Sequence, residues 1–265
     1  MPQPRVLPVT QRFNGRPVLV TGAASGIGAA TARLLAAEGA TVYCADIDTA
    51  GADRTAPALG GAGIPLELDI TDEDQWARAV SRVLAGSGRL DILVNCAGIS
   101  FAAPVDEMSL PDWRRVFAVN LDGAFLGMKH AIRAMGETGG CIINVSSASG
   151  IRPAAGACAY SASKAALGML TRVVAKECRD RKLGIRVNAV APGGVKTPMW
   201  QSMPFFQTLV EQHGSAGAAF QVMAGESGGR FTEPEEIAEA ILYLASEAAA
   251  TITGVELVID DGYIL

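Results

Sequence analysis

Tyr160 and Lys164 are the two residues whose types and spacing most directly suggest catalysis. They lie four positions apart in a run of good helix formers, so a helix would place both side chains on one face. A cation about 4 Å away stabilises a phenolate by about 4 kcal/mol at an effective dielectric constant of about 20, enough to lower a tyrosine pKa from about 10 to about 7. Such a phenol is a general acid and base at neutral pH. Ser147, thirteen residues earlier, would hold a substrate oxygen beside it. Because a single pair of this kind also arises by chance, its interpretation depends on the rest of the chain.

A glycine-rich turn near the start of the sequence indicates a nucleotide-binding site. The segment Val18-Leu-Val-Thr-Gly22-Ala-Ala-Ser-Gly26-Ile-Gly28 runs from a predicted strand into a predicted helix. Glycines let the backbone approach a diphosphate closely, and free N–H groups at the helix N-terminus attract its negative charge. The spacing differs from the common Gly-x-Gly-x-x-Gly fingerprint. A turn that merely packs a strand against a helix is therefore the alternative.

Asp46 ends the next predicted strand, eighteen residues after Gly28, near the spacing at which a carboxylate binds the adenosine ribose. A carboxylate in that position accepts hydrogen bonds from the ribose hydroxyl groups and repels a 2′-phosphate. Ile47, rather than a basic residue, follows it. These residues predict NAD rather than NADP as the cofactor. A solvated aspartate at the end of a strand is the alternative interpretation.

Short β-branched runs alternate with alanine-rich amphipathic segments, and this alternation predicts the order of the elements. Several runs are continuously apolar, as in parallel strands that are covered on both faces. The predicted strands are residues 17–21, 41–46, 63–68, 90–95, 141–146, 185–190 and 255–259, and the predicted helices are residues 27–38, 72–84, 110–135, 158–181 and 234–245. The order predicts an α/β fold of the Rossmann type, with a doubly wound, parallel seven-stranded sheet and helices on both faces. Capping boxes are predicted at Thr71/Asp74, Ser109/Asp112 and Thr232/Glu235.

We expect a single dinucleotide-binding catalytic domain over residues 14–265, because no linker or repeat interrupts the chain. Residues 1–13, which include three prolines, are expected to form a loose arm. Residues 199–231 break the alternation of elements and combine five glycines with many apolar side chains. An insertion of this size in a compact domain is usually a functional lid. Its apolar side chains either contact a substrate or form a small core: Met199, Trp200, Met203, Phe205, Phe206, Phe220 and Met223.

The composition argues against several classes of partner. A net charge of −5 without a cluster of Lys and Arg is unlike a nucleic-acid surface. No apolar run of about 18 residues would span a membrane, and the first thirteen residues lack the apolar core of a signal peptide. Five cysteines without a CxxC pair are expected to be reduced thiols in a cytoplasmic protein. His130 and His213 are too few and too far apart for a metal site, so no metal is expected.

With the glycine turn, Asp46, Ser147, Tyr160 and Lys164 in place, residues 16–262 resemble the short-chain dehydrogenase/reductase family. The resemblance implies that Asp69 contacts the adenine and that Asn95 supports the sheet beside the cofactor. It also implies that the residues around Val195 and Thr197 surround the nicotinamide. The cofactor-binding residues that it implies are Gly22, Ser25, Gly26, Ile27, Gly28, Asp46, Ile47, Asp69, Ile70, Asn95, Ala97, Gly98, Tyr160, Lys164, Pro192, Gly193, Val195 and Thr197.

The resemblance further implies four catalytic residues. The Tyr160 phenolate would take the hydroxyl proton of an alcohol while a hydride passes to the nicotinamide, and Ser147 would hold the substrate oxygen. Lys164 would lower the Tyr160 pKa and bind the nicotinamide ribose. Asn120 would anchor a water that carries the proton outward. Ser147 is chosen over the serines beside it because the family's gap between serine and tyrosine fits it.

Two positions depart from the family pattern. Cys96 stands where a second asparagine is usual, at a position that is expected mainly to pack. Asp261 stands in a segment that more often reads Asp-Gly-Gly, and we expect this change to affect a subunit contact rather than the chemistry.

The sequence thus predicts an NAD-dependent dehydrogenase that acts on a secondary alcohol or its ketone. The apolar lid favours an uncharged cyclic, aromatic or steroid-like substrate. The alternatives are a 3-oxoacyl-thioester reductase, although such relatives more often use NADPH, and a non-catalytic nucleotide-binding scaffold. Enoyl reduction is disfavoured, because those relatives space their Tyr and Lys more widely than Tyr160 and Lys164. The resemblance also implies a homotetramer that is joined through the two long helices and the last strand and helix.

Overall fold

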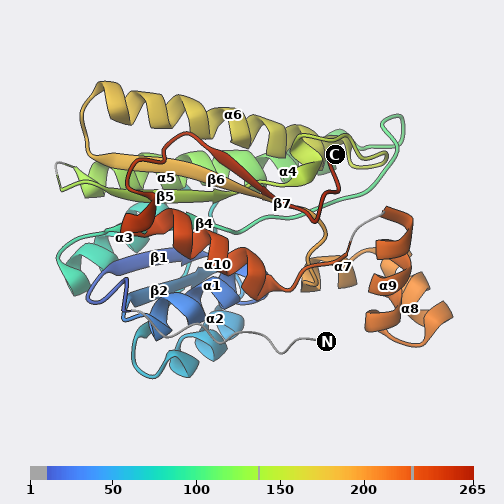
Figure 1. The fold of residues 1–265 in the computed structure, drawn as a ribbon, viewed down its shortest axis with the longest axis horizontal. Coiled ribbons are helices and arrows are strands. Elements are labelled where there is room, and N and C mark those ends of the chain that lie inside the picture. Colours follow the sequence, from blue (N-terminus) through green and yellow to red (C-terminus); the bar gives the residue numbers. More distant parts are fainter. Residues whose placement is uncertain (1–10, 137, 228–229) are drawn as a thin grey trace.

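A computed structural model describes residues 11–136, 138–227 and 230–265 of the chain. In these residues, seven strands form one sheet in the order β3-β2-β1-β4-β5-β6-β7. Every neighbouring pair is parallel, and helices cover both faces of the sheet (Figure 1). This confirms the predicted doubly wound α/β fold. The strands are β1 (Pro17–Thr21), β2 (Thr41–Asp46), β3 (Gly63–Glu67), β4 (Ile92–Asn95), β5 (Gly140–Val145), β6 (Ile185–Pro192) and β7 (Glu256–Ile259).

The main helices divide between the two faces of the sheet. On one face α1 (Gly26–Ala37) packs against α10 (Pro234–Ala245), over a core that includes Leu35 and Ile241. On the other face lie α3 (Glu73–Ser87), α5 (Gly123–Met135) and α6 (Cys158–Asp180), where Trp76 is fully buried. Figure 1 shows α5 and α6 on the side of the sheet opposite α1 and α10. The shorter helices of this part of the fold are α2 (Thr49–Thr55), η1 (Pro57–Leu59), α4 (Leu110–Phe117), η2 (Ala118–Asp122), η3 (Ala148–Gly150) and η4 (Glu247–Ala249).

The strand order places the loops that carry the predicted motifs at one edge of the sheet. β1 pairs with both β2 and β4, so the direction of winding reverses beside β1. In doubly wound folds the crevice at this reversal point, outside the carboxyl ends of the strands, is where ligands bind. The glycine turn after β1 and the loops after β4 and β5 all leave the sheet at this edge.

Three local features differ from the prediction. The helix expected over residues 110–135 is divided into α4 and α5 by η2, a single π-helical turn. The helix α2 was not predicted. Of the predicted capping residues, only Ser109 caps its helix as expected. Asp72 caps α3, and Glu233 caps α10 in a capping box with Glu236, each one residue beyond the predicted cap.

The start of the described chain is anchored in the fold. Phe13 is fully buried, and its backbone N–H donates to the Glu38 carbonyl oxygen at 3.1 Å. Of the expected loose arm over residues 1–13, residues 1–10 lie outside the described part. Packing against the domain has therefore begun by Phe13, before the expected domain start at residue 14.

The predicted lid is itself helical. It contains most of α7 (Pro198–Gln201) together with α8 (Pro204–His213) and α9 (Ala216–Ser227), which lie beside the main body in Figure 1. Phe206, Phe220 and Phe231 pack into a small apolar cluster of their own. The ring centre of Phe220 lies 4.7 Å from that of Phe206 and 5.0 Å from that of Phe231. The lid is thus a helical unit with a core rather than an open loop.

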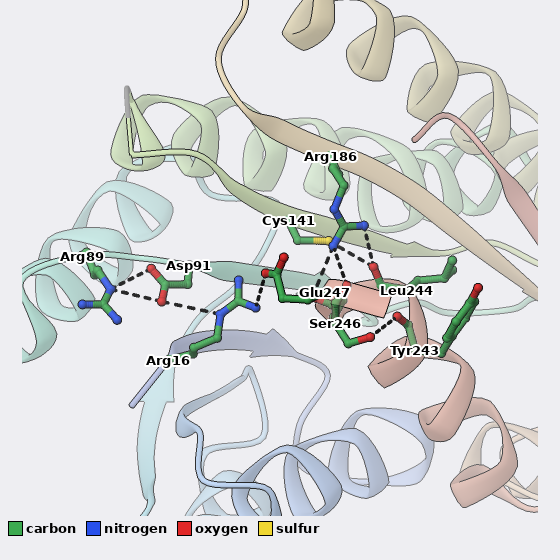
Figure 2. Close-up of polar contacts among 10 residues, drawn as sticks. Arg16, Arg89, Asp91, Cys141, Arg186, Tyr243, Leu244, Ser246 and Glu247 are labelled. Carbon is green, nitrogen blue, oxygen red and sulfur yellow. Dashed lines mark hydrogen bonds and ion pairs between the residues drawn. The ribbon is translucent and has the colours of Figure 1, made fainter. Parts of the chain in front are cut away.

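Arg186 organises the opposite end of the sheet, where the strands begin (Figure 2). Its guanidinium group donates to four backbone carbonyl oxygens at and beyond the end of α10, those of Leu244, Ala245, Ser246 and Ile252. Carbonyl groups at a helix C-terminus have no partner within the helix, and a cation also interacts favourably with the helix dipole there. Nearby, Arg16 lies 3.7 Å from Asp91 and 3.6 Å from Glu247. This network holds α10 against the sheet at the end remote from the crevice.

Candidate active site

A cleft of about 880 Å³ opens at the carboxyl ends of the strands. Of the residues that the sequence predicts for the site, Asn95 and Asn120 alone do not line it. The others come from the turn after β1, the ends of β2 and β3, the loops after β4, β5 and β6, and the first turns of α6. The structure thus brings together segments that are far apart in the sequence.

The glycine turn has the shape of an anion cradle. Gly22 has φ +69°, and a side-chain carbon on Gly28 would lie 2.1 Å from the Gly22 carbonyl oxygen. Ser25, at the start of α1, makes no side-chain cap, and the first turn contains no acidic residue. The N–H groups at the start of α1 therefore have no side-chain cap, and no acidic residue of the first turn would compete with a diphosphate for them. These observations fit a dinucleotide better than a purely structural turn.

Asp46 is fixed at the adjoining end of the cleft. Its two carboxylate oxygens accept hydrogen bonds from the backbone N–H groups of Ala24 and Asp48, each at 2.9 Å. The carboxylate is therefore tied to the glycine turn rather than simply solvated. Asp69 also lines the cleft, with one oxygen accepting from the backbone N–H and the hydroxyl group of Thr71.

Asn95 lies behind the cleft, in a polar network inside the sheet. Its amide donates to Asn144 Oδ1 at 2.9 Å, and the Asn144 amide donates to Thr171 Oγ1 at 2.9 Å. The three residues belong to β4, β5 and α6, so the network fixes the strand ends to the helix that carries Tyr160 and Lys164.

The predicted spacing places Tyr160 and Lys164 on the same side of α6. Lys164 Nζ lies 5.8 Å from the centre of the Tyr160 ring and donates to the Val145 carbonyl oxygen at 2.7 Å. Lys164 is only 3% exposed, whereas Tyr160 is partly exposed at the cleft. Ser147 forms a hydrogen bond with Tyr160. The neighbouring Ser146 instead donates to the Lys164 carbonyl oxygen at 3.1 Å, which agrees with the choice of Ser147.

Asn120 occupies the π-helical turn η2 and is 1% exposed. Its side-chain amide exchanges two 2.9 Å hydrogen bonds with the backbone of Ile99 and donates to Ser163 Oγ at 3.1 Å. A side-chain carbon on Gly98 would lie 3.3 Å from Asn120 Oδ1 and 3.4 Å from Lys164 Nζ. Asn120 therefore joins the loop after β4 to α6, close to Lys164. π-turns of this kind often occur at functional sites.

The electrostatics of the tyrosine differ from the expectation. Burial raises the pKa of Tyr160 above its ordinary value, and the hydrogen bond with Ser147 acts in the opposite direction. Burial also lowers the pKa of Lys164 to about 8. The expected lowering of the Tyr160 pKa by Lys164 is thus wrong for this structure. The reason is that Lys164 Nζ donates to Val145 rather than to the phenol, while loss of water around both groups disfavours their charged forms.

The chain matches known proteins over nearly its full length. The family model described as enoyl-(acyl carrier protein) reductase matches residues 22–264. The cis-4-hydroxycyclohexanecarboxylate dehydrogenase of Sinomonas cyclohexanicum is 44% identical over 96% of this chain and 98% of its own, and the cyclopentanol dehydrogenase of a Comamonas strain is 40% identical over 95% and 98%. A crystal structure of 3-ketoacyl-(acyl-carrier-protein) reductase from Brucella melitensis, complexed with NADH, is similar with a TM-score of 0.83, 31% identity and coverage of 95% and 99%. The chain belongs to the short-chain dehydrogenase/reductase family.

As a short-chain dehydrogenase/reductase, the protein is an oxidoreductase with a nucleotide-binding Rossmann-type domain. No helix in the described part of the chain is long and apolar enough to cross a membrane. Among the same residues, no group of three or more His, Cys, Asp or Glu side chains is arranged to hold a metal ion.

A smaller pocket of about 250 Å³ adjoins the cleft of this short-chain dehydrogenase/reductase, and Ser147 and Tyr160 line both. The lid contributes Met199, Trp200, Met203, Met223 and Phe231 to its wall. Other lid side chains that the sequence suggested for substrate contact lie elsewhere: Phe206 and Phe220 are in the core of the lid, and Phe205 lines neither cavity.

Sequence reasoning missed several residues that line the two cavities. Arg115 and Phe101 line the cleft, and Arg230, Asp260 and Tyr263 line the pocket. Local patterns give no signal for these residues, because only the folded chain brings them to Ser147 and Tyr160. The resemblance did not single them out either.

Proposed function

We propose that the protein is an NAD-dependent dehydrogenase that oxidises a small cyclic secondary alcohol to its ketone, or catalyses the reverse reduction. The observation that carries the proposal is that Ser147 and Tyr160 lie on the wall shared by the nucleotide cleft and the smaller pocket. A substrate oxygen held between them would have its carbinol carbon facing the cleft. This arrangement favours hydride transfer between an alcohol and a nicotinamide.

The residues of the cleft fit NAD. The glycine turn and the N-terminus of α1 would bind the diphosphate, and Asp46 would accept hydrogen bonds from the adenosine ribose. Because two backbone N–H groups hold the Asp46 carboxylate in place, it would be forced to meet a 2′-phosphate at close range. This like-charge contact supports NAD over NADP. When bound, oxidised nicotinamide accepts the hydride and adds a positive charge near Tyr160.

The chain's own residues would then manage the proton. Tyr160 takes the hydroxyl proton during oxidation and returns it during reduction, while Ser147 orients the substrate oxygen. The Lys164 ammonium has donor hydrogens left beyond its bond to Val145, with which it would bind the nicotinamide ribose. Asn120 supports Lys164 by fixing the Ile99 loop to α6.

The character of the pocket supports an uncharged cyclic substrate. Apart from Arg230, the lid side chains in its wall are methionine, tryptophan and phenylalanine, which suit an apolar ring. Two relatives that the chain resembles over nearly its whole length are named for dehydrogenation of cyclic alcohols, one that carries a carboxylate and one that is uncharged, so they support the ring rather than the absence of charge. An apolar ring with one hydroxyl group at the Ser147 and Tyr160 end would match this wall.

A homotetramer in the cytoplasm is part of the same proposal. Phe125 on α5 and Met169 and Val173 on α6 are each between 45% and 56% exposed, although they are apolar. Such exposed apolar side chains on the two long helices support an interface there. The cysteines of the described chain are all free, which suits a reducing compartment.

A second candidate is reduction of 3-oxoacyl thioesters. It is favoured by the similarity to the Brucella melitensis 3-ketoacyl-(acyl-carrier-protein) reductase. The same proton and hydride transfers would serve that reaction, but the substrate would carry a long acyl and thioester arm.

One experiment tests the proposal and separates the candidates. The purified protein is assayed for NADH formation from NAD with cyclohexanol and cyclopentanol, and for NADH and NADPH oxidation with acetoacetyl-coenzyme A. We expect oxidation of the cyclic alcohols with NAD at a higher kcat/KM than with NADP. Turnover of acetoacetyl-coenzyme A alone would favour the second candidate, and absence of turnover with every substrate would contradict both.

A further inference from the structure

The turn after β7 forms part of the wall of the smaller pocket. Asp260 and Tyr263 both line it, together with side chains from the lid. Asp260 shapes the turn, because its two carboxylate oxygens accept hydrogen bonds from the backbone N–H groups of Gly262 at 3.0 Å and Ile264 at 2.9 Å. The turn is also pressed against the end of β6, where a side-chain carbon on Gly193 would lie 2.9 Å from Asp260 Cα. Its position beside the reacting groups is therefore well defined.

Arg152, from the loop after β5, holds Tyr263 in this wall. The Arg152 guanidinium lies over the Tyr263 ring, 4.6 Å from its centre, and Nη1 donates to the Tyr263 carbonyl oxygen. A guanidinium that stacks on an aromatic face and donates to the backbone of the same residue restrains both ring and backbone. Arg152 follows Ser147 by five residues, so the loop that carries the substrate-orienting serine also positions the ring.

Asp261 ties the same turn to the end of the lid. It has φ +53°, a conformation in which glycine is favoured, and it stands where relatives were expected to have glycine. Its carboxylate accepts from the Arg230 backbone N–H at 3.3 Å and lies 4.0 Å from Arg230 Nε. Arg230 is held in turn by two hydrogen bonds to Glu236, at 2.6 and 2.8 Å. The departure that was expected to affect a subunit contact thus makes a contact within this chain.

We propose that Tyr263, positioned by Arg152, limits the substrate to a single ring. This inference rests on the proposed function and specifies its substrate class. The pocket volume of about 250 Å³ lies below the range of about 300–1,000 Å³ of pockets that take drug-sized ligands. A fused multi-ring alcohol with its hydroxyl group at Ser147 and Tyr160 would have to displace the Tyr263 ring. A cyclohexanol-sized substrate would not.

The test compares kcat/KM for cyclohexanol and for a 3β-hydroxyandrostane, with NAD, in the wild type and four variants. Tyr263→Ala removes the ring, Tyr263→Phe keeps it, and Arg152→Met removes the group that positions it. Tyr243→Ala removes an exposed tyrosine of α10 that lines neither cavity and is the matched control.

We expect the wild type to prefer cyclohexanol strongly. Tyr263→Ala should raise the ratio of steroid to cyclohexanol kcat/KM by about tenfold or more, mainly through a lower KM for the steroid. Arg152→Met should shift the ratio in the same direction by a smaller factor, and Tyr263→Phe and Tyr243→Ala should keep the wild-type ratio. A rise in Tyr263→Ala that Tyr263→Phe does not share identifies the ring itself as the limit, because general loosening of the turn would lower kcat for both alcohols.

Two results would overturn the inference while leaving the proposed function intact. One is a wild type that oxidises the steroid as efficiently as cyclohexanol, and the other is an unchanged ratio in Tyr263→Ala. If no variant oxidised any alcohol, the proposed function would fail instead. The size limit would then be tested by equilibrium dialysis of the steroid with NADH present. Binding of the steroid to Tyr263→Ala but not to the wild type would support the limit, and equal binding to both would contradict it.

Discussion

Replacing Lys164 with methionine should change how the stability of the cofactor-free protein depends on pH. Lys164 is 3% exposed, and burial lowers its pKa to about 8 from an ordinary value of 10.5. The folded state therefore holds an ammonium group that is less stable there than in the unfolded chain. Methionine has a similar length and carries no charge, so it removes this effect without opening a large cavity.

The magnitude follows from the difference between the two pKa values. At 1.36 kcal/mol per pKa unit, a fall from 10.5 to about 8 corresponds to about 3 kcal/mol. Below about pH 8 the lysine is charged in both states, and the full destabilisation is present. As the pH rises from about 8 toward 10.5, the unfolded chain binds more protons than the folded protein, so wild-type stability increases. By about pH 9.5, roughly 2 kcal/mol should have been recovered.

The assay is urea unfolding of the wild type and Lys164→Met without cofactor, at several pH values between about 7 and 9.5. The difference in free energy of unfolding between wild type and variant should move in favour of the wild type by about 2 kcal/mol over this range. Lys176→Met replaces an exposed lysine on the same helix and is the control, whose difference from the wild type should stay nearly constant. A flat difference for Lys164→Met as well would refute the reasoning, because it would mean that Lys164 is not desolvated.

Three further predictions concern the cofactor and the scaffold. Asp46→Asn should lower the ratio of kcat/KM for NAD to that for NADP by about tenfold or more, since it removes a charge that repels the 2′-phosphate, and an unchanged ratio would contradict that role. Gly28→Ala should weaken NADH binding in a fluorescence titration and destabilise the fold by about 1–3 kcal/mol, because the added carbon meets the Gly22 carbonyl oxygen. Normal NADH binding by this variant would show that the glycine turn does not bind the diphosphate. Arg186→Ala should lower the free energy of unfolding by about 3 kcal/mol or more by leaving four carbonyl groups without their donor, with turnover per folded molecule unchanged and partial recovery in Arg186→Lys. A fall of less than about 1 kcal/mol in the free energy of unfolding of Arg186→Ala would contradict this, because it would mean that water replaces the guanidinium as the donor to these carbonyl groups.

The parts of the fold that follow from local pattern were predictable. Strands β1 and β2 and helix α10 lie where the alternation of apolar runs placed them. The carboxyl ends of parallel strands meet at one edge of the sheet, and the motifs after β1, β4 and β5 line one cleft there.

What depends on long-range contacts was not predictable. The lid helices α8 and α9 pack on each other through Phe206 and Phe220. The spacing of apolar residues in this segment does not predict that contact. The π-turn at Asn120 depends on contacts with Ile99 and Ser163, which are distant in sequence. Tyr263 lies in the pocket wall in contact with Arg152, which is more than a hundred residues earlier in the sequence.

The electrostatic expectation failed for a related reason. The spacing of Tyr160 and Lys164 correctly predicted that both side chains lie on one face of the helix. It did not predict how strongly the surrounding chain desolvates them. Burial removes water from both groups, and the Val145 carbonyl oxygen accepts a hydrogen bond from the Lys164 ammonium. Spacing along a helix determines direction, whereas desolvation depends on everything that packs around it.

The most direct measurement is turnover by Tyr160→Phe, compared with its binding of NADH. The variant keeps the ring and loses only the hydroxyl group, so we expect it to fold and to bind NADH nearly as the wild type does. Oxidation of cyclohexanol should fall by about a hundredfold to ten-thousandfold, the usual contribution of a general acid and base. Turnover close to that of the wild type, with the phenol absent, would contradict the account.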